Sequence, residues 1–408
     1  MGRPRVPGDG MSDGSVERDD AVAFLRELVR LDTVNPPGHE SRAADLIQAR
    51  LQPLGFDIER AGAEPGRDCL IATLRGAESA PTLVFNGHVD VQPVGPGWTR
   101  DPFGAEVEGE LLYGNGVRDM KAGVAAFVLA AESFARSTRR LRGDLVLQAV
   151  ADEVSGGTKG TGYLFAQNRL AGDFAVVCEP TGVDVYVAHR GMMWFELTVN
   201  GVPAHSGRPW LGVNAIAKVS DIVQALRDSL GPVFAARTHP MLPSPSINLG
   251  RIEGGAKENL VAARCRLAFD RRLLPDETFD RAEAEIRDVI DRVRARDPEN
   301  WTFELERTIA VPGLEIDPQT PIVQECQRAY LDVTGEASRI GCTSGLEDAH
   351  WLARAGIQTA MFGPYVYKRW EGENRFDATT GKPDEHISIP QWLTAIRIYT
   401  RLAQRLLG

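Results

Sequence analysis

Residues 82–90 read TLVFNGHVD, an apolar run that ends in a histidine and an aspartate. A short run of apolar and β-branched residues followed by turn residues is typical of a buried strand. The chain repeats this feature, in alternation with segments whose apolar residues recur at helical spacing. Strands are expected at 69–74, 82–86, 145–150 and 174–178, and helices at 15–31, 41–54 and 122–134. The alternation predicts an α/β domain in which helices flank a mostly parallel sheet.

After Thr181 the pattern changes to that of an α+β module. Strands are expected at 185–188, 193–199, 246–252, 262–271 and 301–307, and helices at 214–226 and 279–296. The α/β pattern returns after Pro312, with helices at 321–331, 347–355 and 391–407 and a strand at 359–362. We therefore assign residues 21–186 and 308–408 to one domain and residues 187–307 to an inserted module. Residues 1–20 are rich in Gly, Pro and charge, and we expect them to form a flexible leader rather than a secretory signal.

The composition restricts the classes of partner. At 408 residues the chain is too long for one compact core, which agrees with two domains. It has 46 Lys and Arg against 56 Asp and Glu, a net charge of −10, and no long basic run, which argues against nucleic acid. The longest weakly polar run, 122–130, is far shorter than the ~20 residues of a membrane span. The five cysteines form neither a metal motif nor a disulfide framework, so we expect a cytoplasmic protein.

The expected strand at 82–86 leads into His88 and Asp90. On an extended chain, residues two apart share a face, so the two side chains are expected to point to the same side. A carboxylate behind a histidine fixes its tautomer and raises its basicity as a metal ligand. The alternative is a histidine and an aspartate in an ordinary turn at the end of a strand.

Four further acidic or histidine clusters follow strands or loops. Asp119 stands where a glycine-rich loop enters an apolar helix, a position that an N-cap would also explain. Asp152 and Glu153 follow the strand at 145–150, and Glu179 follows the next one, where α/β sheets bind ligands. His386 comes after a long polar loop. Nitrogen and carboxylate ligands of this kind suit zinc, with cobalt or manganese as alternatives.

The order of these motifs resembles one family, the zinc-dependent aminoacylases and their relatives. The relatives include acetylornithine deacetylase, succinyl-diaminopimelate desuccinylase, carboxypeptidase G and several dipeptidases. The resemblance covers nearly the whole chain. It implies that His88, Asp119 and Glu179 hold a first metal ion and that Asp90 orients His88. It also implies that Asp119 bridges to a second metal ion, which His386 completes.

The resemblance implies roles for further residues. Glu153 matches the general base of the family, and the peptide bond before Met120 matches its cis bond. The inserted module resembles the lid through which these enzymes form homodimers. Within it His205 matches the histidine that reaches the scissile carbonyl, usually in the partner's active site. Asn259 and Arg272 match residues that hold the substrate, and Arg suits a carboxylate because its planar fork binds two oxygens.

The chain departs from the family pattern at Val154. The family usually has two adjacent glutamates here, the base and then a ligand of the second metal ion. The Gly156-Gly157 pair aligns Glu153 with the base and Val154 with the ligand, and valine has no donor atom. A shifted alignment would make Asp152 the base and Glu153 the ligand. We prefer the alignment without a gap, which predicts one tight metal site and a weak or empty second site.

A second departure is the stretch 364–382, which is longer than the usual link to the final histidine. It carries aromatic and basic residues, among them Arg369 and Trp370. The stretch is either a solvated surface loop or, because it leads into His386, a loop that shapes specificity.

The leading hypothesis is a metal-dependent hydrolase that cleaves the amide bond of an N-acyl amino acid or a similar small carboxylate. A dipeptidase or carboxypeptidase is the alternative, because the same constellation cleaves peptide bonds. Val154 also leaves open an unusual hydrolase with a single metal ion, or a non-catalytic binding protein that kept the fold. The chain keeps the base Glu153, His205 and the four metal ligands, which argues against a non-catalytic binding protein.

Overall fold

The computed structural model describes residues 16–78, 80–137, 141–364 and 382–408. Most of the expected leader and nearly all of the 364–382 stretch, including Arg369 and Trp370, therefore lie outside the described residues. The chain divides into two compact units. Unit 1 comprises residues 1–187, 316–341 and 347–408, and unit 2 comprises residues 188–315 and 342–346.

The main sheet has the strand order β1-β2-β6-β3-β7-β15-β8-β13, with β14 beside β8. The strands are β1 Asp57–Gly62, β2 Asp68–Leu74, β3 Leu83–His88, β6 Leu145–Val150, β7 Phe174–Val177, β8 Val185–His189, β13 Leu314–Glu315, β14 Ile340–Thr343 and β15 Gln358–Met361. The central strands β6, β3, β7 and β15 run parallel, whereas β1 and β2 are antiparallel. The predicted α/β class with a mostly parallel sheet is confirmed.

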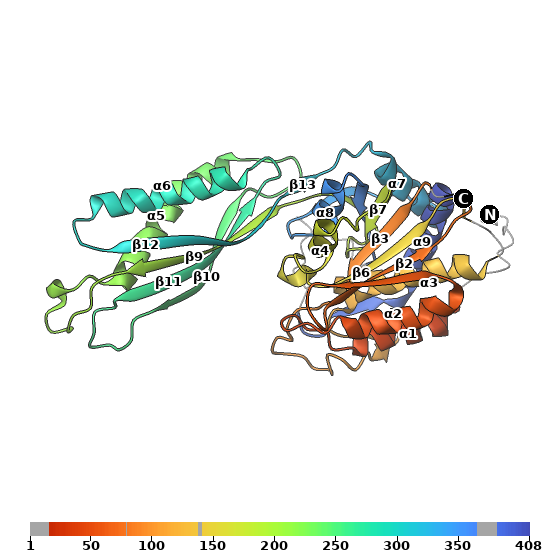
Figure 1. Cartoon of the computed structure of the whole chain (residues 1–408), viewed down its shortest axis with the longest axis horizontal. Helices are drawn as coiled ribbons and strands as arrows, with labels where there is room; N and C mark the ends of the chain where they lie inside the picture. Colours follow the sequence, from red (N-terminus) through yellow and green to blue (C-terminus); the bar gives the residue numbers. More distant parts are fainter. Residues whose placement is uncertain (1–15, 79, 138–140, 365–381) are drawn as a thin grey trace, which may run out of the picture. The chain divides into compact units, whose positions relative to one another are not determined.

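Helices cover both faces of this sheet (Figure 1). They are α1 Arg18–Arg30, α2 Ser41–Leu51, α3 Ala122–Arg136, α4 Thr161–Ala166, α7 Pro321–Thr334, α8 Ala349–Arg354 and α9 Ile389–Leu407. α3 is apolar and buried along most of its length because it packs against the sheet and against α9, where the Trp392 indole donates to the Ala122 carbonyl. Gly123 allows this packing, since a Cβ there would lie 2.2 Å from the Cys178 carbonyl oxygen.

Unit 2 contains a four-stranded antiparallel sheet in the order β10-β11-β9-β12. The strands are β9 Gly191–Asn200, β10 Ser246–Gly254, β11 Arg264–Leu273 and β12 Thr302–Val311. The helices α5 Ala215–Ala236 and α6 Phe279–Arg296 lie side by side against it (Figure 1). Buried and exposed residues alternate along β11, as expected for a sheet with one covered face. Unit 2 continues past residue 307 because β12 runs to Val311.

A small third sheet, absent from the expected elements, has the order β16-β5-β4. Its strands are β4 Val107–Glu108, β5 Leu111–Tyr113 and β16 His386–Ser388. β1 was also not expected, because its sequence, DIERAG, is polar and lies at the edge of the main sheet. Among the described residues, no helix is both long and apolar enough to cross a membrane.

Candidate metal centre

Three of the four predicted metal ligands, His88, Asp119 and Glu179, lie close together at the carboxyl edge of the main sheet, with the predicted base Glu153. His88 is the last residue of β3, Glu153 follows β6, and Glu179 follows β7. Asp119 lies in the short η2 turn, Val117–Lys121, that leads into α3. The Asp119–Met120 peptide bond is cis, so that prediction is confirmed. The carboxyl edge of an α/β sheet is where such folds bind ligands.

The His88 ring lies at the centre of this cluster. Its Nε2 is 3.0 Å from an Asp119 oxygen and 3.7 Å from one oxygen each of Glu153 and Glu179. His88, Asp119 and Glu179 offer ligand atoms that all lie within 4.8 Å of one another. Within the described part of the chain, the buried Glu179 Oε1 has no hydrogen-bond partner. One imidazole nitrogen and two carboxylates, with an unsatisfied oxygen among them, fit a divalent transition metal ion.

Asp90 fixes the orientation of His88. The His88 Nδ1 lies 2.8 Å from the Asp90 carbonyl oxygen and 3.5 Å from an Asp90 carboxylate oxygen, so Nε2 faces the cluster. The Asp90 carboxylate in turn accepts from Asn35 Nδ2 at 2.8 Å and from the backbone of Glu153 and Val154 at 3.2 and 3.3 Å. Asp90 therefore joins the end of β3 to the turn that carries Glu153.

The electrostatics of the cluster favour a bound cation. Burial raises the pKa of Glu153 and of Glu179 well above the usual value for glutamate; the Glu347 carboxylate raises both further, and His88 opposes the rise. Burial lowers the pKa of His88, but Glu179 and Asp119 more than offset this and raise it well above its usual value. A metal ion would supply the positive charge that these buried carboxylates lack.

Asp152, the alternative base, has a different environment. Its carboxylate pairs with Arg67 at 3.1 Å and accepts from Asn35 at 3.3 Å and from the Lys159 backbone at 2.9 Å. Arg67 also pairs with Glu40, and all three side chains of this ion network are almost fully buried. The hydrogen-bonding capacity of Asp152 is thus engaged in holding the turn.

Replacing Arg67 by methionine should lower the free energy of unfolding by about 3–5 kcal/mol, because it leaves Glu40 and Asp152 buried without their cation. Urea denaturation measures this change. The control is Arg18→Met, which breaks the exposed pair with Glu110 and should cost less than about 1 kcal/mol. Equal losses in the two variants would contradict a structural role for the buried network.

His386 lies on β16 and pairs with Tyr113 of β5. The neighbouring Glu385 accepts from the backbone N–H groups of Arg118 and Asp119, at 2.7 and 3.4 Å, which attaches β16 to the turn that carries Asp119. His386 nevertheless belongs to neither of the two groups of three close ligands found among the described residues.

The second of these groups consists of Glu153, Glu179 and Glu347, and Glu347 was not expected at the site. In the sequence it begins the helical pattern at 347–355, where acidic residues are common because of the helix dipole. Val154 is the feature of the sequence that could have indicated Glu347. Because valine replaces a usual carboxylate ligand, another carboxylate could be expected nearby.

The three predicted substrate residues lie in unit 2. His205 forms a β-bridge with Leu260, and the Ser206 N–H donates to the Asn259 carbonyl at 3.0 Å, so His205 and Asn259 are neighbours. Both are exposed. Arg272 lies on β11 and pairs with Asp270 at 2.9 Å.

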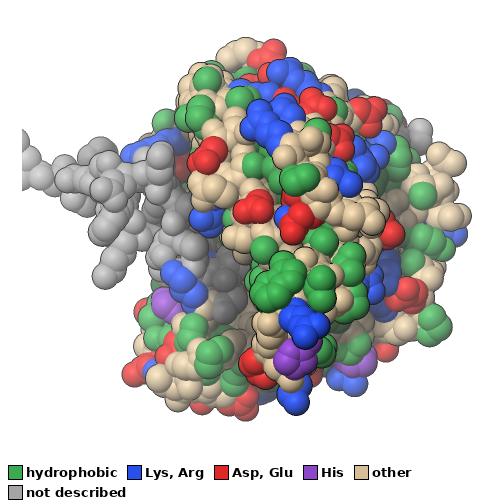
Figure 2. All heavy atoms as spheres, turned by 90° about the vertical axis from the view of Figure 1, so that its left-hand side faces the viewer, with side chains coloured by type: hydrophobic (Ala, Val, Ile, Leu, Met, Phe, Trp, Pro, Cys, Tyr) green, Lys and Arg blue, Asp and Glu red, His purple; other side chains and the backbone are tan. Residues whose placement is uncertain are grey.

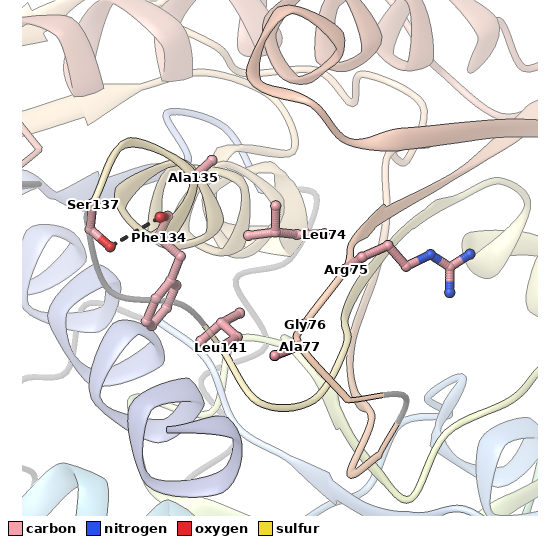
Figure 3. A pocket seen from close by; sticks show the side chains of 8 residues that line it. All are labelled: Leu74, Arg75, Gly76, Ala77, Phe134, Ala135, Ser137 and Leu141. Carbon is pink, nitrogen blue, oxygen red and sulfur yellow. Dashed lines mark hydrogen bonds between the residues drawn. The ribbon is translucent and has the colours of Figure 1, made fainter.

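Figure 3 shows a cavity of about 240 Å³ that none of the candidate metal ligands lines. Its lining includes Leu74, Phe134 and Leu141. Leu74 pairs with the first residue of β6, whereas His88 pairs with the last one. The cavity and the metal centre therefore lie near opposite ends of strand β6.

Comparison with known proteins identifies the family. The sequence profile described as peptidase family M20/M25/M40 matches residues 84–405. The chain belongs to this family. The resemblance inferred from the motifs is therefore confirmed, and the candidate ligands stand in a metal-dependent peptidase family.

Individual relatives cover most of the chain. The succinyl-diaminopimelate desuccinylase of Alkalilimnicola ehrlichii is 30% identical over 404 residues, which is 95% of this chain and 100% of that protein. A deformylase of Bacillus subtilis, named for N-formyl-4-amino-5-aminomethyl-2-methylpyrimidine, is 29% identical over 378 residues, 85% of this chain and 87% of that protein. The M20 metallo-carboxypeptidase Sso-CP2 of Sulfolobus solfataricus shares the fold, with a TM-score of 0.76, 17% identity and coverage of 95% and 99%.

Proposed function

We propose that the protein is a metal-dependent hydrolase that removes the acyl group from an N-acyl amino acid or a similar small carboxylate. The observation that carries this is the cluster of His88, Asp119 and Glu179 with Glu153 beside it, 3.7 Å from the same imidazole nitrogen. Two M20 relatives of this chain, a desuccinylase and a deformylase, are named for the removal of acyl groups.

His88, Asp119 and Glu179 would hold the metal ion, with zinc the expected element and cobalt or manganese the alternatives. When bound, the ion would supply Lewis acidity that polarises the scissile carbonyl and acidifies water. Glu153 takes the proton of the attacking water and passes it to the leaving nitrogen. Asp90 keeps the His88 ring in place through the contact at Nδ1.

We assign recognition of the substrate to unit 2. His205 would stabilise the developing oxyanion, which its exposed position supports. Arg272 and Asn259 would hold the substrate carboxylate. Asp270 orients the Arg272 guanidinium through contacts at 2.9 and 3.0 Å and leaves other N–H groups of the fork for a ligand.

A panel of substrates tests this function. The purified protein, loaded in turn with zinc, cobalt and manganese, should release amine from N-acyl amino acids faster than from dipeptides. Faster cleavage of dipeptides would favour a peptidase, the second hypothesis. Absence of hydrolysis with every metal and substrate would favour the non-catalytic binding protein.

We further infer a homodimer formed through unit 2, with His205 acting in the active site of the partner subunit. In Figure 2, where unit 2 faces the viewer, hydrophobic side chains lie among charged ones, and a small group of them lies together below the centre of the view. Trp210 and Leu211, near His205 in the chain, are 75% and 63% exposed. Apolar surface of this kind is common at protein interfaces.

Mixing two inactive variants tests the dimer. His205→Ala and Glu153→Ala subunits should regain partial activity when they exchange, because one of the two sites in a mixed dimer has both residues intact. Light scattering gives the oligomeric state, and the same mixture without subunit exchange is the control. A monomer at micromolar concentration would contradict the proposal.

Val154 predicts that one metal ion is held tightly and that any second ion is lost on dialysis. Val154→Glu should raise the affinity of the second site, since it restores the carboxylate that the family usually has there. Metal analysis after dialysis counts the ions that the wild-type protein and Val154→Glu retain. Val154→Gln is the control, because it adds volume without charge. Two ions retained by the wild-type protein would support the shifted alignment, in which Glu153 is a ligand.

A further inference from the structure

Glu153, Glu179 and Glu347 bring three carboxylates together beside the candidate metal centre. Their ligand oxygens lie within 4.8 Å of one another, and Glu179 is common to this group and to the group that contains His88. Glu179 is 3% exposed, and its Oε1 has no hydrogen-bond partner among the described atoms. A buried carboxylate oxygen without a donor is costly unless a ligand satisfies it.

The segment that carries Glu347 is fixed in place. The Glu347 carbonyl lies 2.9 Å from His350 Nδ1, within the turn that leads into α8. The adjacent Asp348 accepts from the Thr161 hydroxyl of α4 at 2.7 Å. Gly157 leaves room for this contact, because a Cβ there would lie 2.3 Å from an Asp348 oxygen. Glu347 therefore stands on a positioned turn.

The donor set of this group differs from that of the first. It offers carboxylate oxygens and no imidazole nitrogen, which favours hard cations such as Mn²⁺ over zinc. Glu153 and Glu347 are partly exposed, so an ion can reach them and keep water ligands. Glu347 also brings a carboxylate close to that of Glu153, which precedes Val154 in the chain.

We propose that Glu153, Glu179 and Glu347 form a second, weaker site for a hard divalent cation, in which Glu347 provides the carboxylate that residue 154 does not. An ion in this site would bind the carboxylate of Glu153, which could then no longer accept a proton. Because Glu153 is the base in the proposed function, on which this part rests, occupancy of the second site inhibits the enzyme. The chain would thus need one ion for activity and lose activity with a second.

Equilibrium titration with Mn²⁺, in which electron paramagnetic resonance counts the free ion, tests the site without any measurement of activity. The full-length wild-type protein should bind one ion tightly and a second weakly. Glu347→Gln should keep the first ion and weaken the second by roughly tenfold or more, since one charged ligand is lost. Glu347→Ala removes the same carboxylate and provides the test if the glutamine variant fails to fold. Glu304→Gln, an equal charge change at an exposed position of β12, should bind both ions as the wild type does.

Activity in excess Mn²⁺ gives the second readout. Wild-type hydrolysis should fall as the second site fills, and Glu347→Gln should resist this inhibition. Three results would each overturn the proposal. The wild-type protein could bind only one ion at millimolar Mn²⁺, or Glu347→Gln could bind both ions as tightly as the wild type does. The third is that His386→Ala loses the second ion while Glu347→Gln keeps it. If no substrate is hydrolysed, the proposed function fails, whereas the counts of bound ions still decide whether the second site exists.

Discussion

Glu153→Gln should lower kcat by about 10²–10⁴-fold, the range expected when a general base is removed, while the tightly bound metal ion stays in place. Glutamine keeps the size of the side chain but cannot accept the proton of the attacking water. Steady-state kinetics on an N-acyl amino acid, together with metal analysis of the same sample, separates loss of the base from loss of the ion.

Asp152→Asn is the matched control, because it makes the same chemical change one residue earlier. It should mainly lower stability, since Asp152 pairs with the buried Arg67. A large fall in kcat for Asp152→Asn, with little change for Glu153→Gln, would reverse the two roles.

The pH dependence of kcat/KM gives an independent check on Glu153. Burial raises its pKa above the usual value for glutamate, with His88 opposing and Glu347 adding to the rise. The base must be ionised to accept a proton, so activity falls as the pH drops through this raised pKa. The acidic limb of the profile should therefore disappear with Glu153→Gln.

His88→Ala should lose most of the bound metal and nearly all activity. His88 provides the imidazole nitrogen of the first group, and its Nε2 lies within 3.7 Å of three carboxylates. Without it those carboxylates keep their charge but lack the nitrogen ligand that suits zinc. Elemental analysis after dialysis measures the loss, and His39→Ala, at an exposed histidine, is the control. Full occupancy in His88→Ala would remove His88 from the metal site.

The core of unit 1 could be predicted because its elements are strongly apolar. β3 and α3 are buried along nearly their whole length, so composition alone marks them. Three other strands were missed for the opposite reason: β5 and β16 have only three residues each, and polar residues occupy much of β1 and β16. Such strands depend on the partner with which they pair, which no local pattern encodes.

In the candidate site, too, residues next to apolar strands could be predicted from the sequence, whereas residues that meet only through tertiary packing could not. His88 ends an apolar strand, and Glu153 and Glu179 closely follow two others, so their place at the carboxyl edge follows from the α/β pattern. Glu347 follows the short β14 and lies near Glu153 only through tertiary packing. Arg67 likewise meets Asp152 across a long stretch of chain. Long-range pairings of this kind carry no periodic signal.

The order of strands in the main sheet has a consequence for synthesis on the ribosome. β15 lies between β7 and β8, although residues 188–315 of unit 2 are made before it. Unit 2 has its own hydrophobic core and its four long strands between Gly191 and Val311, so it can fold while the rest of the chain is still being translated. Until residues 358–361 emerge, β7 lacks the strand that covers its outer edge, and open edges of this kind invite aggregation. A nascent chain that stalls in this interval would carry a finished unit 2 beside an open sheet, which makes it a target for chaperones.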